Sequence, residues 1–247
     1  KDRLYLNYKL RQYILLICAL IRIFFIKSHF SEILNKTNDE EYLTTLIDKY
    51  WFLSDKILDD NIYYSLEGYL YPDTYNFYAS DTLEKIFEKI LDNTSKKLND
   101  YKTDLENSKY SVHEILTFAS MTEKEGISYS DRQNIVGVFI NRLGINMSLG
   151  SDVTTYYAFN KSMKEVLTSA EINTYNLYNT RGPRMEGKLP IGPICNPSIE
   201  SIKASIYYTD NDYLYFVADK NRKVYFTKTY SEHQQMIASL KERGLWL

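Results

Sequence analysis

Apolar residues recur at helical spacing between Ser111 and Gly126 and predict a helix with one buried face. Ser111 and Glu114 form a capping-box pattern that begins this helix, and Gly126 is a typical helix stop. The residues that define the inward face are Val112, Ile115, Leu116 and Ala119. The segment is therefore expected to pack along the protein core.

Similar patterns along the rest of the chain predict an α+β protein, with mixed helices and short antiparallel strands. The further helices are expected at 38–58, 81–105, 198–207 and 230–244, and one more is capped by Ser130 and Gln133 and ends at Gly144. Residues 213–218 and 223–229 read as the two strands of a hairpin.

In two other segments the apolar residues do not recur with a simple period. Residues 66–77 alternate aromatic and polar side chains around Gly68 and Pro72, which indicates either a strand with a bend or a rigid loop. Residues 145–197 are rich in Gly, Pro, Asn and Thr, which is typical of loops shaped around a ligand.

One carboxylate of the 111–126 helix falls on its apolar face. Eleven residues at about 100° each bring Glu123 to within roughly 20° of Val112, whereas Glu125 comes out at about 220° and is expected to face water. Burial and the negative end of the helix dipole both disfavour a charged carboxylate, so we expect the pKa of Glu123 to be raised. Such an acid can donate its proton to a leaving group. The alternative is a structural glutamate paired with a buried arginine, and Arg142 is a candidate partner.

Composition excludes several kinds of chemistry. The 247 residues carry a net charge of −2, so broad attraction to nucleic acid is not expected. The two cysteines and three histidines lack the spacing of metal ligands, and no glycine-rich phosphate loop or serine nucleophile elbow is present. The sequence therefore predicts no metal and no cofactor.

Residues 13–26 are almost wholly apolar and are flanked by Lys9, Arg11 and Lys27. A membrane-spanning helix needs about 20 such residues, and this run is shorter and contains Arg22. It is consistent with a signal anchor, an interfacial helix or a buried helix packed on the domain, and its length and Arg22 count against the anchor.

A series of short motifs follows in a fixed order. They are Leu-Glu-Gly-Tyr-Leu-Tyr-Pro-Asp-Thr-Tyr (66–75), Ala-Ser-Met-Thr-Glu-Lys-Glu-Gly (119–126), Val-Phe-Ile-Asn-Arg-Leu (138–143), Met-Ser-Leu-Gly-Ser-Asp-Val-Thr (147–154), Tyr-Asn-Thr (178–180), Leu-Pro-Ile-Gly-Pro-Ile (189–194), Tyr-Leu-Tyr-Phe-Val (213–217) and Tyr-Phe-Thr-Lys-Thr (225–229). Together they resemble the MltG (YceG-like) endolytic murein transglycosylases of bacterial cell walls, over most of the chain.

The resemblance implies a catalytic acid at the first glutamate of Glu-Lys-Glu, which is Glu123, the residue that the helical face selects on its own. It implies a lytic transglycosylase that cleaves MurNAc-β-1,4-GlcNAc bonds within peptidoglycan strands. The products would carry 1,6-anhydro-MurNAc ends, and the cuts would limit nascent strand length. A single acid suffices for this reaction because the 6-hydroxyl of the sugar is the nucleophile.

The resemblance also implies an arrangement of domains. Members of the family typically have a membrane anchor, a small LysM-like module and the catalytic domain. Residues 1–60 are then an N-terminal helical region, which is either a membrane anchor or a truncated LysM-like remnant. Residues 61–247 are the catalytic domain, with a glycan-binding cleft. The expected location is the cell membrane, with a single-pass anchor and an extracytoplasmic catalytic domain. The expected partners are peptidoglycan glycan strands and cell-wall synthases.

Polar residues of the motifs are the candidates for binding the glycan around the acid. They are Asn141, Asp152, Thr154, Tyr157, Asn179 and Asn196. Their amide, hydroxyl and carboxylate groups suit the N-acetyl and hydroxyl groups of the sugar. The alternative is that they hold the loops in shape, as Asn and Asp often do in turns.

The chain departs from the family pattern near these candidates. Val153 stands where proline is common, Arg181 replaces a frequent tyrosine after Tyr-Asn-Thr, and 182–188 is slightly longer than usual. Residues 224–226 stand where a histidine often precedes the strand. Two alternatives to the transglycosylase remain: a muramidase, in which water is the nucleophile, and a module that binds glycan or a synthase without cutting.

Overall fold

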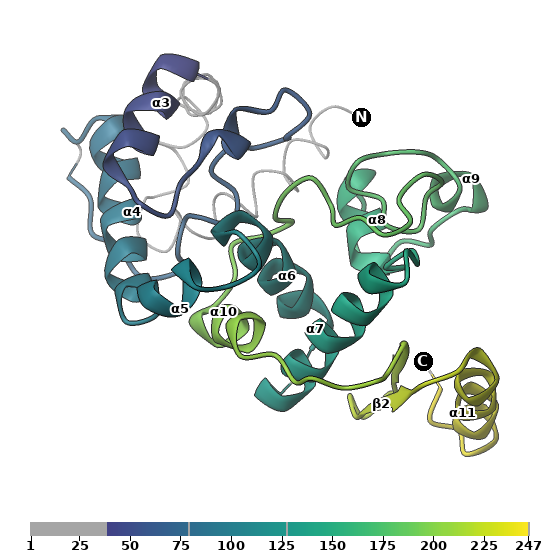
Figure 1. The fold of residues 1–247 in the computed structure, drawn as a ribbon. Coiled ribbons are helices and arrows are strands. Elements are labelled where there is room, and N and C mark those ends of the chain that lie inside the picture. The colour runs from purple at the N-terminus through teal and green to yellow at the C-terminus, as the bar shows by residue number, and fades with distance from the viewer. Residues whose placement is uncertain (1–38, 79, 127, 247) are drawn as a thin grey trace. The chain divides into compact units, whose positions relative to one another are not determined.

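The computed structural model describes residues 39–78, 80–126 and 128–246 (Figure 1). The apolar run at 13–26 lies outside the described residues. Within the described ranges, no helix combines the length and the apolar character that crossing a membrane requires.

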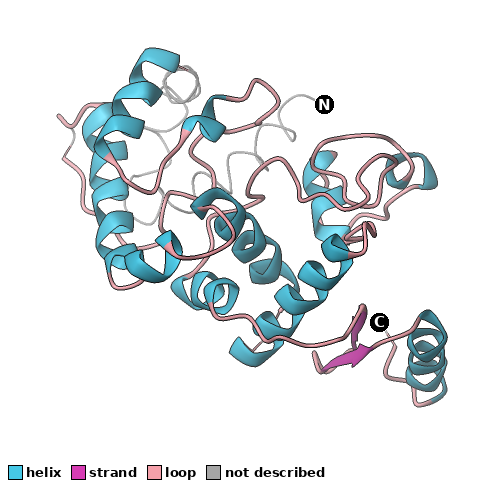
Figure 2. Cartoon of the chain, in the orientation of Figure 1, coloured by secondary structure: helices cyan, strands magenta, loops and turns pink. Residues whose placement is uncertain are grey.

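The described chain is mostly helical, with one small antiparallel sheet (Figure 2). Its elements are α3 (Glu40–Lys49), η1 (Asp55–Leu58), α4 (Leu83–Asn99), α5 (Lys102–Glu106), α6 (Val112–Glu125), α7 (Tyr129–Gly144), α8 (Asp152–Ala158), α9 (Ser169–Ile172), α10 (Ile199–Ile206), β1 (Tyr215–Ala218), β2 (Val224–Thr227) and α11 (Tyr230–Glu242). The strands pair antiparallel with Phe216 opposite Phe226. The architecture agrees with the predicted α+β class and with the predicted hairpin.

Several predicted boundaries are wrong for local reasons. The helix expected at 81–105 is interrupted at Asp100 and Tyr101, after Asn99, because asparagine and aspartate favour helix ends over helix interiors. The helix expected at 38–58 ends at Lys49, and a separate 3₁₀ turn follows. The helix that ends at Gly144 has its capping box at Ser128 and Asp131, two residues earlier than predicted. No strand forms at 66–77, where the rigid-loop alternative is correct.

The chain divides into two compact units. Within the described residues, the first comprises 39–117 and Ile191–Ser198. The domain boundary expected at residue 60 stays a prediction. The core of the first unit includes Phe87, Ile90 and Leu91 of α4. The hydroxyl of Thr94 on the same helix donates to Tyr69 O at 2.7 Å and accepts from Tyr71 N at 3.0 Å, which fixes the 66–77 loop.

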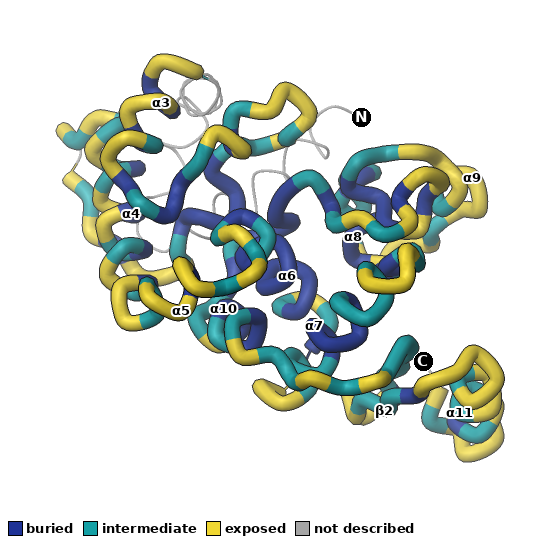
Figure 3. The backbone as a smooth tube through the Cα atoms, in the orientation of Figure 1, coloured by how far each residue is buried: buried dark blue, intermediate teal, exposed yellow. Residues whose placement is uncertain are grey.

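The second unit comprises Phe118–Pro190 and Ile199–Leu247. Within it, α7 packs against α10, and the chain between α10 and β1 is bonded along α7. Helix α6 enters this unit after Thr117 and is buried on every side over residues 115–122, as the dark blue tube in Figure 3 shows. A helix buried all round has no solvent face to contrast with its core face.

Candidate active site

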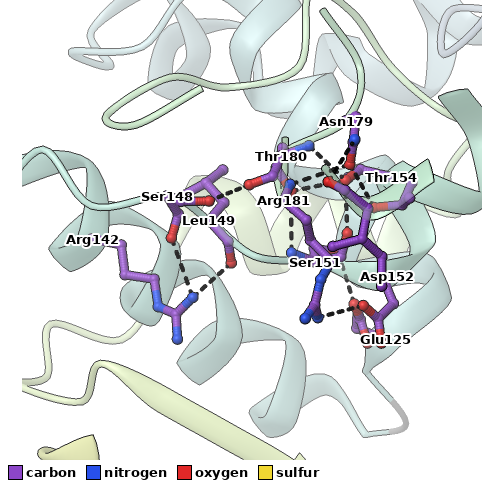
Figure 4. Close-up of polar contacts among 12 residues, drawn as sticks. Glu125, Arg142, Ser148, Leu149, Ser151, Asp152, Thr154, Asn179, Thr180 and Arg181 are labelled. Atoms are coloured by element: carbon purple, nitrogen blue, oxygen red, sulfur yellow. Dashed lines mark hydrogen bonds and ion pairs between the residues drawn. The ribbon is translucent and has the colours of Figure 1, made fainter. Parts of the chain in front are cut away.

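Glu125 is the last residue of α6, and its carboxyl group has a raised pKa. Its Oε1 accepts a 2.8 Å hydrogen bond from Ser151 Oγ, and Asp152 lies beside it (Figure 4). Burial raises the pKa of Glu125 to about 7, with the negative charge of Asp152 acting in the same direction and the Ser151 hydrogen bond acting against both. The carboxyl group can therefore carry a proton near neutral pH and release it to a bound molecule.

Glu125 was predicted to face water, but it is half-buried and its carboxyl group contacts Ser151. The helical-face argument assumed that α6 has one exposed side, but residues 115–122 are buried whichever way they point. The side on which Glu125 lies is covered by Ser151, from a loop that sequence periodicity does not place. A signal was present in the sequence: residues 115–122 contain no charged residue over more than two helical turns.

The loop that carries Ser151 is bonded to the Tyr-Asn-Thr motif. Gly150 N donates to Thr180 O at 3.2 Å, and Ser151 N donates to Thr180 Oγ1 at 3.1 Å. Ser148 Oγ also donates to Thr180 O. Gly150 adopts φ +61°, a conformation that glycine adopts without strain. Three hydrogen bonds to Thr180 thus fix the position of Ser151 relative to Glu125.

Thr154 and Asn179, both predicted to bind glycan, are fully buried. Thr154 Oγ1 donates to Ser151 O at 2.7 Å and lies 2.8 Å from Thr180 Oγ1. Asn179 Oδ1 accepts from Thr155 Oγ1 at 2.7 Å, and its Nδ2 donates to three backbone carbonyls between residues 171 and 174. With no exposed surface, neither side chain can contact a ligand in this conformation. Both side chains hold the loops around Ser151 in shape here, and their binding of glycan stays a prediction.

Arg142 supports the same loop from α7. Its Nη1 donates to Ser148 O at 3.2 Å and Leu149 O at 2.8 Å, and its Nε donates to Leu214 O at 2.5 Å. Arg142 therefore binds three backbone carbonyls in place of the predicted carboxylate. Backbone carbonyls in loops need such donors because they lack the regular hydrogen bonds of a helix. Burial lowers the pKa of Arg142, and the charge of Arg181 adds to the lowering.

Asp152 and Arg181 form an exposed ion pair at the site. Arg181 Nη1 lies 2.6 Å from Asp152 Oδ1, and the two side chains are 37% and 56% exposed. Asp152 therefore remains accessible, as a residue that binds substrate must be. Its carboxylate, however, already has a cationic partner from the residue that departs from the family pattern.

The predicted acid Glu123 lies two residues before Glu125 and is half-buried. Its Oε2 accepts a 2.6 Å hydrogen bond from Ser201 Oγ, on α10. Nothing in its surroundings tests a catalytic role, so that role stays a prediction. The contact shows what Glu123 does in this conformation, which is to join the end of α6 to α10.

The remaining predicted binding residues lie in different settings. Tyr157 on α8 is half-buried, with its ring 4.8 Å from that of Tyr178. Asn141 Nδ2 donates to Asn211 O at 2.8 Å and Tyr213 O at 3.0 Å, so its donor group is already engaged. Asn196 belongs to the first unit, where its Oδ1 accepts hydrogen bonds from Gly68 N and Leu70 N. Among the described residues, no group of three or more His, Cys, Asp or Glu side chains could hold a metal ion.

Comparison with known proteins gives consistent matches. The sequence model of the YceG-like family matches residues 19–239. A protein of Bacillus subtilis (strain 168) named endolytic murein transglycosylase is 37% identical over 208 residues, which are 83% of this chain and 56% of that protein. A protein of the same name from Streptococcus pneumoniae serotype 2 (strain D39 / NCTC 7466) is 34% identical over 215 residues, or 83% of this chain and 38% of that protein. The chain thus spans about half the length, or less, of these relatives.

A solved structure shows the same fold. The crystal structure of a yceG-like protein from Listeria monocytogenes superposes with a TM-score of 0.76 at 36% sequence identity. The match covers 83% of this chain and 67% of that one.

Proposed function

The chain belongs to the YceG-like family, and from that premise we propose that it is an endolytic lytic transglycosylase that cleaves MurNAc-β-1,4-GlcNAc bonds within peptidoglycan glycan strands. The observation that carries this proposal is the carboxyl group of Glu125, held by Ser151 with a pKa of about 7. The relatives named endolytic murein transglycosylase support the substrate class.

In the proposed reaction, protonated Glu125 donates its proton to the glycosidic oxygen while the bond from that oxygen to C1 of MurNAc breaks. The 6-hydroxyl of the same MurNAc attacks C1, and the ionised Glu125 accepts the hydroxyl proton. The products are a 1,6-anhydro-MurNAc end and a free GlcNAc 4-hydroxyl, and no water is consumed. Because the nucleophile is already tethered to the reacting sugar, the protein need not position a water molecule.

The muramidase alternative rests on Asp152. A glycoside hydrolase places two carboxylates at the scissile bond, and Asp152 is close enough to Glu125 for its charge to act on it. Its carboxylate is already paired with Arg181 at 2.6 Å, so a water molecule would have to compete with the guanidinium for it. We therefore favour the transglycosylase.

The proposal extends to the setting of the enzyme. A glycan strand would bind in a cleft around Glu125, with Asp152 and Tyr157 at its edge. Since peptidoglycan lies outside the cytoplasmic membrane, we place the catalytic part there, anchored by a single membrane span and able to act beside cell-wall synthases. Cuts near the growing end would then limit the length of nascent strands.

The test is mass spectrometry of purified glycan strands after incubation with the protein, with Glu125→Gln and with Glu123→Gln. We expect internal cuts with 1,6-anhydro ends from the unmodified protein, a loss of about a hundredfold or more with Glu125→Gln, and cutting retained with Glu123→Gln. Glutamine keeps the shape and the hydrogen-bond acceptor at both positions but cannot give up a proton.

Each other outcome has a distinct meaning. Loss with Glu123→Gln alone would transfer the acid to the residue predicted from the sequence. Reducing ends in place of anhydro ends would establish the muramidase. Strands that bind to the unmodified protein and remain uncut would leave a binding module.

A further inference from the structure

Arg181 presents hydrogen-bond donors beside the proposed acid. Its guanidinium donates through one nitrogen, Nη1, to one oxygen of Asp152, and it makes no other hydrogen bond with the part of the chain that the structure describes. A guanidinium carries five N–H donors in a fork that matches a carboxylate. An end-on pair of this kind therefore leaves donors available to a second anion.

The backbone beneath Arg181 is firmly held. It follows directly after Asn179 and Thr180, which are both fully buried. Arg181 N donates to Asn179 Oδ1 at 3.3 Å, so the backbone from which the side chain extends is held in place. Groups mounted on such a support lose less freedom when they bind a ligand than groups on a mobile loop.

The surrounding charges favour an anion at this place. Arg142 and Arg181 are close enough for their charges to interact, and Glu125 carries little negative charge below neutral pH. Arg181 is already paired with Asp152. This ion pair is exposed, so a second carboxylate can reach the same guanidinium. An incoming carboxylate thus meets a cation with spare donors next to the reacting bond.

We propose that Arg181 is a specificity-determining residue that binds a carboxylate on the muramic acid side of the glycan strand, through the guanidinium donors that Asp152 does not use. This inference rests on the proposed function and names a feature of its substrate. Each muramic acid carries a lactyl ether whose carboxyl group is either free or joined to a stem peptide that bears carboxylates of its own. The two sources share one chemistry, and the substrates used can separate them.

The experiment compares three glycan strands of equal length: strands with free lactyl carboxylates, the same strands with those groups converted to methylamides, and strands that carry stem peptides. The measurement is kcat/KM for each strand, expressed relative to the methylamide strand. We expect the unmodified protein to prefer at least one carboxylate-bearing strand by on the order of tenfold, the usual effect of one charge-assisted hydrogen bond. The strand that shows the preference identifies which carboxylate Arg181 binds.

Two variants test Arg181 itself. Arg181→Gln should bring the ratio close to one, whereas Asp152→Asn should raise it, because the competing carboxylate is removed. Ratios between strands cancel any effect of these changes on the acidity of Glu125. The control is Arg184→Gln, which removes the same charge from the same loop, where the guanidinium lies 4.0 Å from the ring centre of Tyr175. That variant should keep the ratio of the unmodified protein.

The result that would overturn the proposal is an unmodified protein without preference, or an Arg181→Gln variant that loses activity equally on all three strands. Equal loss would mean that Arg181 only holds Asp152. If no strand is cut at all, the proposed function fails instead, and the same ratios can be measured as Kd values by fluorescence anisotropy. A Kd preference that Arg181→Gln abolishes would then still support the carboxylate site.

Discussion

At the scale of single residues, the protonation of Glu125 depends on two neighbours that act in opposite directions. The hydroxyl of Ser151 donates to the carboxylate and stabilises its charged form, which lowers the pKa. The negative charge of Asp152 disfavours a second charge nearby and raises it. Burial, the largest cause, also raises the pKa, so the balance leaves an acid that is protonated below about pH 7.

The two neighbours should therefore shift the alkaline limb of the pH–rate profile in opposite directions. An acid must be protonated to act, so glycan cutting should fall as pH rises through about 7. Ser151→Ala should move this fall to higher pH, and Asp152→Asn should move it to lower pH. The check is kcat/KM for strand cutting between pH 5 and 9.

Above its pKa, the protonated fraction of a carboxyl group falls about tenfold per pH unit, so even a small displacement is visible at pH 8. Arg184→Gln serves as a control for general charge effects and should leave the limb in place. Shifts of the same sign in both variants would contradict the opposing roles of Ser151 and Asp152.

The sequence and the geometry of the structure point to different glutamates of the same motif, Glu123 and Glu125. Periodicity places Glu123 within roughly 20° of the apolar face and Glu125 on the opposite side, which would be decisive for a helix at the surface. Helix α6 is buried all round over residues 115–122, and both half-buried glutamates at its end contact protein, Glu123 through Ser201 and Glu125 through Ser151. Contacts with residues so distant in sequence are what periodicity cannot supply.

At the scale of elements, helix α7 is the support on which the loop before β1 is built. Gln133 O accepts from Thr209 N at 3.2 Å, and Asn141 Nδ2 donates to Asn211 O at 2.8 Å. Arg142 Nε donates to Leu214 O further along the same loop, and its Nη1 donates to Leu149 O in the loop that carries Ser151. One face of one helix thus positions both the hairpin entry and the loop of the candidate site.

Gly137 lies on this face of α7, where a side chain has no room. A Cβ there would overlap Asn211 Nδ2 and Thr209 O. Gly137→Ala should therefore lower the free energy of unfolding by about 1–3 kcal/mol, because overpacking exceeds the gain in helix propensity. A Cβ on Gly144, the last residue of the same helix, would meet no other atom within 4 Å, so Gly144→Ala should be neutral or stabilising by about 0.5 kcal/mol. Urea unfolding measures both, and equal stabilities would contradict the tight approach at Gly137.

Elements were predictable where local signals agreed. Periodicity together with a stop signal placed the end of α7 at Gly144, and the aromatic run placed β1 and β2. Helix α8 was missed because its buried Thr154 and Thr155 break the apolar pattern, and their hydroxyl groups find partners in Thr180 and Asn179, far along the chain. A short helix that depends on a partner 24 residues further on has no signal of its own.

At the scale of the whole molecule, the chain passes between the two units three times, at 117–118, 190–191 and 198–199. The first passage lies inside the continuous helix α6. The other two enclose a short segment that is bonded into the first unit, where Asn196 Oδ1 accepts from Gly68 N at 2.8 Å and from Leu70 N at 3.0 Å. His113 Nε2 lies 2.8 Å from Ile191 O in the same segment. Neither unit is therefore a separable stretch of sequence.

Asn196→Ala should weaken both units, although its contacts lie in the first. It leaves two backbone N–H groups without their acceptor, at a cost of about 2–4 kcal/mol. If residues 191–198 detach, the start of α10 is no longer held, and if the first unit unfolds, α6 frays from its N-terminal end. Unfolding should therefore spread to the second unit. Asn196→Asp is the matched control, because a carboxylate oxygen can accept the same two hydrogen bonds, and it should lose much less.

The two tryptophans of the chain make this coupling measurable, since Trp51 belongs to the first unit and Trp246 to the second. In a Trp246→Phe background, fluorescence reports the first unit, and in a Trp51→Phe background it reports the second. We expect Asn196→Ala to lower the urea midpoint of both reporters by the same amount, since cooperative unfolding gives coincident transitions. A shift confined to Trp51 would show that the units unfold independently and that continuity of α6 does not couple them.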